Sequence, residues 1–328
     1  MEESLHKIGE VGPGHRSGFA AILGKPNAGK STLLNALVGE KIAIVSDKPQ
    51  TTRDRITGIV STDDYQVVFV DTPGVIVPTD RFNEALMFRV REALESLDVL
   101  IHLVDATDRE PANERLEELL AGVRVPSRFL VMNKTDQLRQ IEGVDVVRET
   151  ALRLGLDPER YTQMFAISAL TGDGVPALME ATVARLNPGP RYYDPEQLSD
   201  RDERFLVAEI VREKVFTNLG DEVPYAIFTE TEEFTERPNK DFIRVTIYVE
   251  RESQKGIVIG DGGAMLKRIG QEARVDIEQL TGRGAYLELW VKVRKNWRKT
   301  DFDLNNFGFK AKSKNSDAKA QRRKEKRS

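Results

Sequence analysis

Gly24-Lys25-Pro26-Asn27-Ala28-Gly29-Lys30-Ser31 fits G-x-x-x-x-G-K-[ST], the glycine-rich loop that cradles nucleotide phosphates. The apolar run Phe19–Leu23 before it predicts a strand. Ser31–Val38 after it predicts a helix, and Gly39 is a natural residue to end one. In this order, backbone N–H groups and the helix dipole point at a bound anion. The stretch therefore predicts a phosphate site after the first strand of an α/β fold.

The side chains of this loop have distinct expected tasks. Lys30 is expected to contact the β- and γ-phosphates, and the Ser31 hydroxyl is expected to bind magnesium. The expected nucleotide contacts are Gly24, Lys25, Pro26, Asn27, Ala28, Gly29, Lys30, Ser31 and Thr32. The alternative is a glycine turn that opens an ordinary helix, and the motifs that follow along the chain argue against it.

The composition limits the class of protein. The 328 residues suggest two domains, and 40% hydrophobic residues suffice for a sizeable core. The absence of cysteine excludes disulfides and cysteine–metal sites, and three histidines leave little room for a histidine cluster. The chain opens with no signal-peptide pattern and contains no apolar run long enough to span a membrane. We expect a soluble, cytoplasmic protein.

The net charge of -4 argues against a general attraction to nucleic acid, but the charges are unevenly placed. Acidic residues cluster at Glu230, Glu232, Glu233 and Glu236. Basic residues cluster at Lys292, Arg294, Lys295, Arg298 and Lys299, and again at Lys310, Lys312, Lys314, Lys319, Arg322, Arg323, Lys324, Lys326 and Arg327. This asymmetry predicts an anionic partner near the C-terminus, with a solvated charged tail as the alternative for about the last twenty residues.

From residue 17 to residue 186 the pattern alternates between strands and helices, which predicts a doubly wound, mostly parallel sheet. The candidate strands are Tyr65–Val70, Val99–Val104, Phe129–Met132 and Met164–Ile167. Each is followed by a polar residue, and ligands of such sheets bind at the carboxyl ends of the strands. His102 lies inside an apolar strand, so we expect a buried core histidine without a catalytic role.

Asp71-Thr72-Pro73-Gly74 follows one of these strands, and all four residues are expected to contact the nucleotide. An aspartate in this place can hold magnesium, usually through water, and the Gly74 N–H can approach a γ-phosphate. The polar segment Lys48–Asp54 has no apolar periodicity, which predicts a loop. A threonine hydroxyl there can reach the magnesium only when the γ-phosphate is present. Thr52 is the first candidate and Thr51 the second.

Asn133-Lys134-Thr135-Asp136 decides which base is bound. The Asp136 carboxylate can accept hydrogen bonds from guanine N1–H and the 2-amino group, whereas adenine would present a lone pair to it. Guanine is therefore favoured, and Asn133, Lys134 and Asp136 are the expected contacts. Ser168-Ala169-Leu170 follows the strand that ends at Ile167, and its backbone N–H groups are expected near the guanine carbonyl oxygen.

These five elements in this order resemble the translation-factor-like GTPases over residues 17–186. Within that class, Lys48-Pro49-Gln50-Thr51-Thr52-Arg53 followed by Asp71-Thr72-Pro73-Gly74 is similar to the Era family of ribosome-assembly GTPases. The resemblance implies that the chain binds GTP and GDP with magnesium and hydrolyses GTP. The expected catalytic residues are then Lys30, Thr52 and Gly74, and the expected magnesium ligands are Ser31, Thr52 and Asp71.

Two details of the resemblance concern catalysis. The residue after Gly74 is the apolar Val75, so no glutamine in that place orients the attacking water. We therefore expect slow intrinsic hydrolysis, on the order of 10⁻⁴ to 10⁻² per second. Asn27 is a candidate ligand of an activating potassium ion, because several relatives with asparagine there depend on potassium; a loop-packing asparagine is the alternative.

Asn187-Pro188-Gly189-Pro190 breaks the alternation and predicts a linker over residues 187–200. Residues 1–16 are expected to form a loose lead-in, and 201–309 a second, α+β domain. The expected elements of that domain are a helix over Phe205–Phe216, strands over Tyr225–Thr229 and Phe242–Val249, helical sequence over Ala264–Leu280 interrupted at Gly270, and a strand over Tyr286–Val293.

Gly260-Asp261-Gly262-Gly263 matches the GXXG loop of KH domains, which clamps the backbone of about four nucleotides. The pattern also occurs at Gly9–Gly12, but the later copy stands between an apolar run and a helix start, in an element order similar to the type II KH fold. The expected RNA contacts are Gly260, Asp261, Gly262, Gly263, Lys267, Arg268 and Lys292, with Ile257, Ile259 and Ile269 lining a groove for bases. A carboxylate at Asp261 is unfavourable beside phosphate.

The Era resemblance extends to residue 309 and implies binding to the 3′ end of small-subunit (16S) ribosomal RNA, controlled by GTP, in 30S subunit assembly. It also implies peripheral association with the inner face of the cell membrane. The tail over 310–328 lies outside the resemblance, and its composition predicts a disordered basic segment.

The leading hypothesis is a monomeric, GTP-switched RNA-binding assembly factor. The alternative is a signalling G protein whose C-terminal domain docks a protein or membrane partner. A P-loop enzyme that uses ATP is disfavoured by Asn133-Lys134-Thr135-Asp136.

Overall fold

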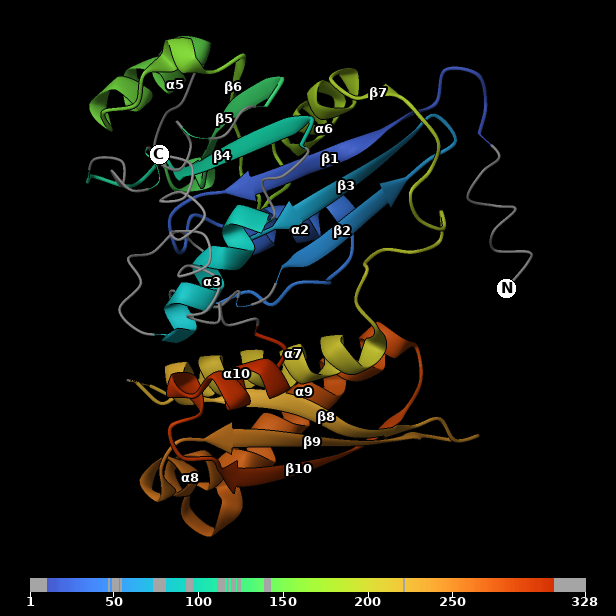
Figure 1. Ribbon diagram of the computed structural model, residues 1–328, viewed down its shortest axis with the longest axis vertical. Coiled ribbons are helices and arrows are strands. Elements are labelled where there is room, and N and C mark those ends of the chain that lie inside the picture. Colours follow the sequence, from blue (N-terminus) through green and yellow to red (C-terminus); the bar gives the residue numbers. More distant parts are fainter. Residues whose placement is uncertain are drawn as a thin grey trace, which may run out of the picture.

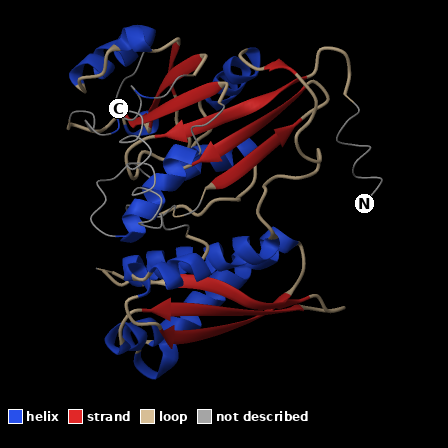
Figure 2. Ribbon diagram, viewed as in Figure 1, coloured by secondary structure: helices blue, strands red, loops and turns tan. Residues whose placement is uncertain are grey.

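The chain folds into two units, each with its own sheet (Figure 1). The computed structural model describes residues 11–46, 55–72, 81–92, 97–110, 125–138, 143–220 and 222–309, together with positions 48, 53, 116, 118 and 122. Figure 2 shows helices flanking the first sheet and the three-stranded second sheet as a separate layer. The units meet where α3 (Arg81–Glu92) of the first packs near α10 (Asp301–Asn306) of the second.

The first sheet has the strand order β2-β3-β1-β4-β5-β6, with β7 on the far end of β1. The pairs β1/β3, β1/β4, β4/β5 and β5/β6 are parallel, whereas β2 and β7 are antiparallel to their neighbours. The strands are β1 (Arg16–Leu23), β2 (Ile56–Ser61), β3 (Tyr65–Asp71), β4 (Val99–Asp105), β5 (Ser127–Asn133), β6 (Gln163–Ala166) and β7 (Asn187–Pro188). The predicted doubly wound, mostly parallel sheet is confirmed.

Helices cover both faces of this sheet, because successive side chains of a strand point to opposite sides. Ala20 and Ile22 of β1 pack with α2 and α6, whereas Ala21 and Leu23 pack on the other side with Met87 of α3. The α-helices among the described residues of this unit are α2 (Lys30–Val38), α3 (Arg81–Glu92), α5 (Gly143–Arg153) and α6 (Val175–Ala184). Both faces are therefore buried, which explains the nearly continuous apolar runs in β1, β3 and β4.

The polar ends of the central strands meet at one edge of the sheet. Asp71 lies opposite Ile22 in the β1/β3 register, and Asp105 lies opposite Asn133 in the β4/β5 register. The glycine-rich loop leaves the same edge, directly after Leu23. Strand pairing thus brings the starts of three separate sequence motifs to one edge of the sheet.

The predicted linker, residues 187–200, is attached to the first sheet along its length. Its β7 strand pairs with β1, and the Leu198 carbonyl accepts a hydrogen bond from the Ile59 amide at 2.8 Å. Gln66 Oε1 accepts from the amides of Tyr192 and Tyr193 at 2.6 and 3.0 Å. The connection therefore moves with the first unit until it reaches α7.

The second unit packs three helices on one face of the three-stranded sheet β10-β9-β8. β9 and β10 are parallel, and β8 is antiparallel to β9. The elements are α7 (Glu203–Asn218), β8 (Phe228–Thr235), β9 (Asp241–Val249), α8 (Glu252–Ile259), α9 (Ala264–Thr281), β10 (Ala285–Val293) and α10 (Asp301–Asn306). The order helix, two strands, two helices, strand confirms the predicted type II KH fold.

Several local predictions for this unit were wrong. The chain at Pro224–Ala226 is a 3-10 turn, and the strand begins only at Phe228. The helix α9 is continuous across Gly270, and a Cβ at that position would make only ordinary van der Waals contact with Leu289, at 3.4 Å from its Cδ1. The two helices between β9 and β10 are therefore α8 and α9, and not two halves of the sequence after Ala264. Ile269 is fully buried in the core and lines no groove.

Aromatic side chains after β10 join the two units. Trp297 is fully buried, and its indole N–H donates to the Ala226 carbonyl at 2.9 Å. Its ring lies edge-on to Phe82 of α3, with 5.5 Å between centroids. Phe307 stacks on Phe228 of β8 at 4.0 Å, and Phe309 meets Phe82 at 5.0 Å. The segment around α10 is thus an apolar wedge between α3 and the second sheet.

Replacing Trp297 by alanine is expected to lower the free energy of unfolding by about 3–5 kcal/mol, because a large buried side chain and its hydrogen bond are lost. Trp290→Ala is the matched control, since Trp290 is 42% exposed, and we expect a loss of about 1 kcal/mol or less. Urea unfolding followed by circular dichroism measures both. Equal losses would contradict the role of Trp297 at the junction.

Candidate functional site

The glycine-rich loop has a shape that only glycine permits at two places. Gly29 precedes α2 with φ 93°, and a Cβ there would lie 2.3 Å from Asn133 Nδ2. A Cβ on Gly24 would lie 2.3 Å from the Leu103 carbonyl oxygen. No side chain caps the first turn of α2, so its N–H groups remain directed at the loop. This is the arrangement that receives a phosphate.

Lys30 is buried inside the curl of the loop. Its Nζ donates to the carbonyls of Lys25 at 2.9 Å and Gly24 at 3.3 Å. Burial lowers the pKa of Lys30, and the Asp71 carboxylate opposes that shift. An ammonium held this way is preorganised to meet an incoming anion, because little side-chain freedom is left to lose.

Ser31 and Asp71 are brought together across the edge of the sheet. The Ser31 hydroxyl donates to Asp71 Oδ2 at 2.8 Å. Two hard oxygen ligands side by side suit a magnesium ion that takes its remaining ligands from phosphate and water. Within the described ranges no group of three or more His, Cys, Asp or Glu residues could hold a metal ion. The described residues contribute the Ser31–Asp71 pair to the expected magnesium site, and Thr52 lies outside them. Thr72 is fastened differently, because its hydroxyl donates to the Ile22 carbonyl at 3.0 Å.

Asn133 ties three of the motifs together. Its Nδ2 donates to the Ala28 carbonyl at 2.8 Å, and its Oδ1 accepts from the Ala169 amide at 2.9 Å. The side chain is 2% exposed. It therefore holds the glycine-rich loop at a fixed distance from Ser168-Ala169-Leu170, a structural task in addition to the predicted nucleotide contact.

Asp136 is exposed and oriented by a neighbour. Its Oδ1 accepts a hydrogen bond from the Ser168 hydroxyl at 2.6 Å. The amide of Ser168 donates to Asp173, and that of Ala169 to Asn133, so two of the three amides expected near a base are engaged within the protein. In the part of the chain that the structure describes, the Leu170 amide has no acceptor. Leu170 itself is 77% exposed.

Two ion pairs that sequence reasoning missed border the loop. Lys25 Nζ lies 2.7 Å from Asp108, and Lys134 Nζ lies 2.7 Å from Asp105. Burial opposes ionisation of Asp108, but the hydrogen bonds from Lys25 and from backbone N–H groups hold the pKa of that carboxyl below its ordinary value. Asp105 had a signal in the sequence, because it ends an apolar strand as Asp71 does.

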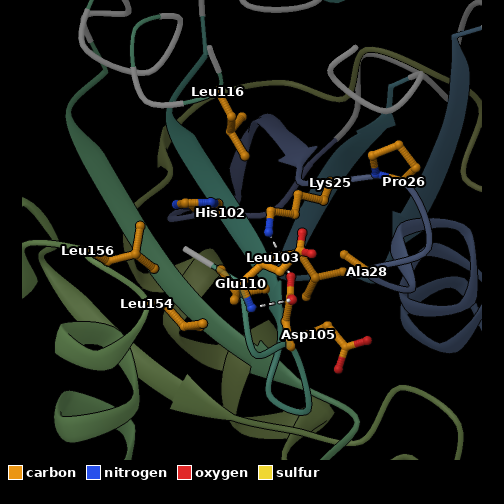
Figure 3. A pocket seen from close by; sticks show the side chains of 12 residues that line it. Lys25, Pro26, Ala28, His102, Leu103, Asp105, Glu110, Leu116, Leu154 and Leu156 are labelled. Atoms are coloured by element: carbon orange, nitrogen blue, oxygen red, sulfur yellow. Dashed lines mark hydrogen bonds and ion pairs between the residues drawn. The ribbon is translucent and has the colours of Figure 1, made fainter. Parts of the chain in front are cut away.

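A small pocket of about 70 Å³ lies beside the loop (Figure 3). Lys25 reaches into it, and His102, Leu154 and Leu156 line its wall. Lys30, Ser31 and Asp136 do not line it. The pocket therefore borders the glycine-rich loop through Lys25, Pro26 and Ala28, but it does not include the side chains expected to hold the γ-phosphate, magnesium and the base.

Several predicted site residues lie outside the described residues: Thr51, Thr52, Pro73, Gly74 and Val75. Asn27 is described, and its φ of 63° places it in the left-handed region. The structure thus gives Asn27 a role in shaping the loop.

The GXXG loop connects α8 to α9. Gly260, Gly262 and Gly263 have φ values of 73°, 54° and 82°. A Cβ on Gly260 would lie 2.6 Å from Met265 Cβ, so the turn requires glycine. The backbone is consequently bare at the start of α9, where an RNA phosphate can approach.

The charged residues around this loop are divided between two faces. Lys267 and Arg268 are exposed one turn into α9, and Arg268 Nε lies 2.9 Å from Glu272. Lys292 is paired with Glu232 at 2.7 Å and follows the core residue Val291. Its side chain therefore lies on the sheet face away from the helices, and the structure does not bring it to the GXXG loop.

Comparisons with known proteins agree with this division into two units. The family described as "50S ribosome-binding GTPase" matches residues 19–134, and the family described as "KH domain" matches residues 222–298. GTPase Era of Carboxydothermus hydrogenoformans is 43% identical over 298 residues, covering 90% of this chain and 98% of that protein. GTPase Era of Geobacter metallireducens is 45% identical over 297 residues, with the same coverage.

Two solved structures resemble the whole described fold. One is a variant of Aquifex aeolicus Era bound to GDP·AlF4⁻, and the other is Era in complex with MgGDPNP and nucleotides 1506–1542 of 16S ribosomal RNA. Each is 35% identical and matches with a TM-score of 0.83 over 90% of this chain and 99% of that chain. Since both units contribute to the match, the chain shares their relative placement.

His102 is a core residue, as expected. It is buried, and its Nδ1 lies 2.7 Å from the Tyr161 hydroxyl. Burial, followed by the charge of Arg128, lowers its pKa to about 3.

We expect the imidazole NMR signals of His102 to show no titration between pH 8 and pH 5. The unfolded chain takes up a proton near pH 6.5, whereas the folded chain does so only near pH 3. Protonation of the unfolded chain at His102 therefore lowers the free energy of unfolding as the pH falls from about 6.5 to about 3. A titration midpoint above pH 5 would contradict its burial as a neutral group.

Proposed function

The chain belongs to the Era family of GTPases, and from this premise we propose that it is a GTP-controlled factor that binds the 3′ end of small-subunit ribosomal RNA in 30S subunit assembly. The observation that carries the proposal is the match of both units, in one placement, to Era bound to MgGDPNP and 16S ribosomal RNA nucleotides. The KH fold and its bare GXXG backbone supply the RNA-binding chemistry in this chain.

The reaction is hydrolysis of GTP to GDP and phosphate by water. Lys30 would hold the β- and γ-phosphates, and Ser31 with Asp71 would hold magnesium, which neutralises phosphate charge when it is bound. Thr52 and Gly74 are proposed to complete the γ-phosphate contacts. The protein contributes position and charge and forms no covalent bond to the substrate.

Guanine is proposed to bind between the Asp136 carboxylate and the Leu170 amide. The Ser168 hydroxyl fixes the direction of the Asp136 carboxylate, so it presents acceptors to N1–H and the 2-amino group. Lys134 stands beside this place, positioned by Asp105. Fixed acceptors of this kind reject adenine, because the bound base would leave them without donors.

Hydrolysis by the protein alone is proposed to be slow, roughly 10⁻⁴ to 10⁻² per second, because Val75 stands where other GTPases have a glutamine. Potassium binding through Asn27 belongs to the same proposal. Multiple-turnover kinetics in sodium and in potassium buffers measure both.

RNA is proposed to bind at the GXXG loop with Lys267 and Arg268, whereas Lys292 contributes little because it lies on the other face. The signalling alternative, in which this unit docks a protein or a membrane, is not favoured by the relatives. No helix among the described residues is long and apolar enough to cross a membrane. Action in the cytoplasm, as a monomer with peripheral membrane association, stays a prediction.

Asp136→Asn is expected to weaken GTP binding by about 100-fold or more, because the amide group presents donors to the two N–H groups of guanine. Asp173→Asn is the matched control in the neighbouring loop, and we expect a change of less than about threefold. Competition against labelled GDP measures both. A variant at Asp136 that binds GTP normally, or a protein from which ATP displaces GDP as well as GTP does, would refute guanine recognition.

Asp261→Asn is expected to strengthen binding of an RNA that copies the 16S 3′ end by about two- to fivefold at low salt, since a negative charge beside phosphate is removed. The gain should shrink toward 1 M salt as charges are screened. Glu180→Gln on α6 removes an exposed carboxylate from the other unit and should leave affinity unchanged. Fluorescence anisotropy compares the variants, and an unchanged affinity for Asp261→Asn would place the RNA phosphates elsewhere.

A further inference from the structure

We propose that the nucleotide state is passed to the RNA-binding unit by direct contact, through Lys48 and Arg53, and not along the linker. These two residues belong to the segment between α2 and β2 and are anchored on backbone carbonyls of the second unit. The proposal rests on the proposed function, because it names the route by which GTP controls RNA binding.

Lys48 is anchored at the end of α7. Its Nζ donates to the carbonyls of Phe216 and Leu219. The last carbonyls of a helix have no partner within the helix and carry the negative end of its dipole, so a cation is stabilised there. Lys48 therefore occupies a position that the C-terminus of α7 would otherwise offer to solvent.

Arg53 is anchored on the next stretch of the same unit. Its Nη2 donates to the carbonyls of Pro224 at 3.0 Å and Tyr225 at 3.1 Å, and its Nη1 donates to the Ile227 carbonyl. Only 4% of the residue is exposed. A guanidinium buried this deeply depends on those carbonyls, because its burial lowers the pKa and penalises the charge.

Arg53 also touches both units through aromatic rings. Its guanidinium carbon lies 5.4 Å from the ring centre of Phe82 in α3 and 5.6 Å from that of Phe216 in α7. The helix α3 follows Asp71-Thr72-Pro73-Gly74 in the chain. Arg53, in the segment that precedes β2, thus contacts both the helix that follows β3 and the C-terminal part of α7.

The anchors lie close to the phosphate site along the chain. Arg53 is three residues before Ile56, which lies opposite Asp71 in the β2/β3 register. Three residues span at most about 11 Å. On the proposed route, exchange of GTP for GDP acts on Arg53 and, through it, on the carbonyls at Pro224–Ile227.

Further contacts extend this interface toward α9. Lys41 Nζ lies 2.7 Å from Glu213 of α7 and 2.8 Å from Asp276 of α9. Asn218, the last residue of α7, donates to Glu272 at 2.5 Å, and Glu272 in turn pairs with Arg268 beside the GXXG loop. A continuous set of polar contacts thus joins the end of α7 to the proposed RNA contact Arg268.

The linker offers a poorer route. Residues 187–200 are paired with β1 and β2 and held by Gln66, so they follow the first unit as one body. The last linker residues meet the segment before β2, because Arg201 donates to the Arg55 carbonyl at 2.7 Å and Arg55 pairs with Asp200 at 3.8 Å. These contacts lie at the start of α7, at the opposite end of that helix from the carbonyls that Lys48 contacts. The contacts of Lys48 and Arg53 instead reach the C-terminus of α7 and the carbonyls of Pro224–Ile227, from which Asn218 leads on to α9.

The test measures RNA affinity in the GDPNP-bound and GDP-bound forms of the full chain and takes their ratio as the coupling factor. We expect a factor of about ten or more for the unaltered protein and below about three for Lys48→Met, which keeps the length of the side chain but loses its donor. Lys48→Arg restores a donor and should return the factor to within about twofold.

Two controls separate the routes. Lys214→Met removes a lysine whose ion pairs stay within the second unit, and it should leave the coupling factor within about twofold of the unaltered protein. Gln66→Met loosens the linker and should do the same. Loss of coupling in Gln66→Met with coupling kept in Lys48→Met would overturn the proposal in favour of the linker.

The outcomes also separate this inference from the proposed function. A coupling factor near one in the unaltered protein refutes GTP control itself. A large factor that Lys48→Met leaves intact refutes only the route through the anchors. A drop in RNA affinity that Lys48→Met causes equally in both nucleotide states would show a structural effect and would also overturn the proposed route.

Discussion

The nucleotide site depends on two hydrogen bonds made by the side chain of Asn133. One amide group holds the Ala28 carbonyl of the glycine-rich loop and the Ala169 amide of the last motif. The strands bring these segments to one edge of the sheet, but strand pairing alone leaves the loops above them free. The absence of a side chain at Gly29 lets the amide approach. The geometry of the phosphate and base sites thus follows from one buried residue.

The nucleotide motifs could be predicted from the sequence because each is a short segment whose chemistry is local. The positions of Lys30, Ser31 and Asp71 follow from a strand, a turn and a helix start. The anchors of Lys48 and Arg53 could not be predicted, because their acceptors are carbonyls 168 to 174 positions away. Every residue has a backbone carbonyl, so the sequence does not indicate which carbonyl accepts a hydrogen bond. Which carbonyls Lys48 and Arg53 contact depends on how the two units dock.

The KH unit also has features that could not be predicted from the sequence. The element order was predicted, yet Gly270 was taken for a helix break although α9 runs through it, because its partners in the core hold the helix there. Lys292 looked like an RNA contact because it belongs to a basic cluster, but the alternation of β10 turns it to the far face, where Glu232 neutralises it. Basic residues that are close together in the sequence can therefore lie on different faces of a sheet, and some of them are neutralised by acidic residues of other strands.

The central claim is that GTP in the first unit controls RNA binding by the second. The most direct measurement is the affinity for an RNA copying the 16S 3′ end, determined for the same preparation loaded with GDPNP and then with GDP. The account predicts binding at least about tenfold tighter with GDPNP, since Arg53, three residues before β2, is anchored on the second domain. Equal affinities in the two states would contradict it, and the chain would then hold a GTPase and an RNA-binding domain that act independently.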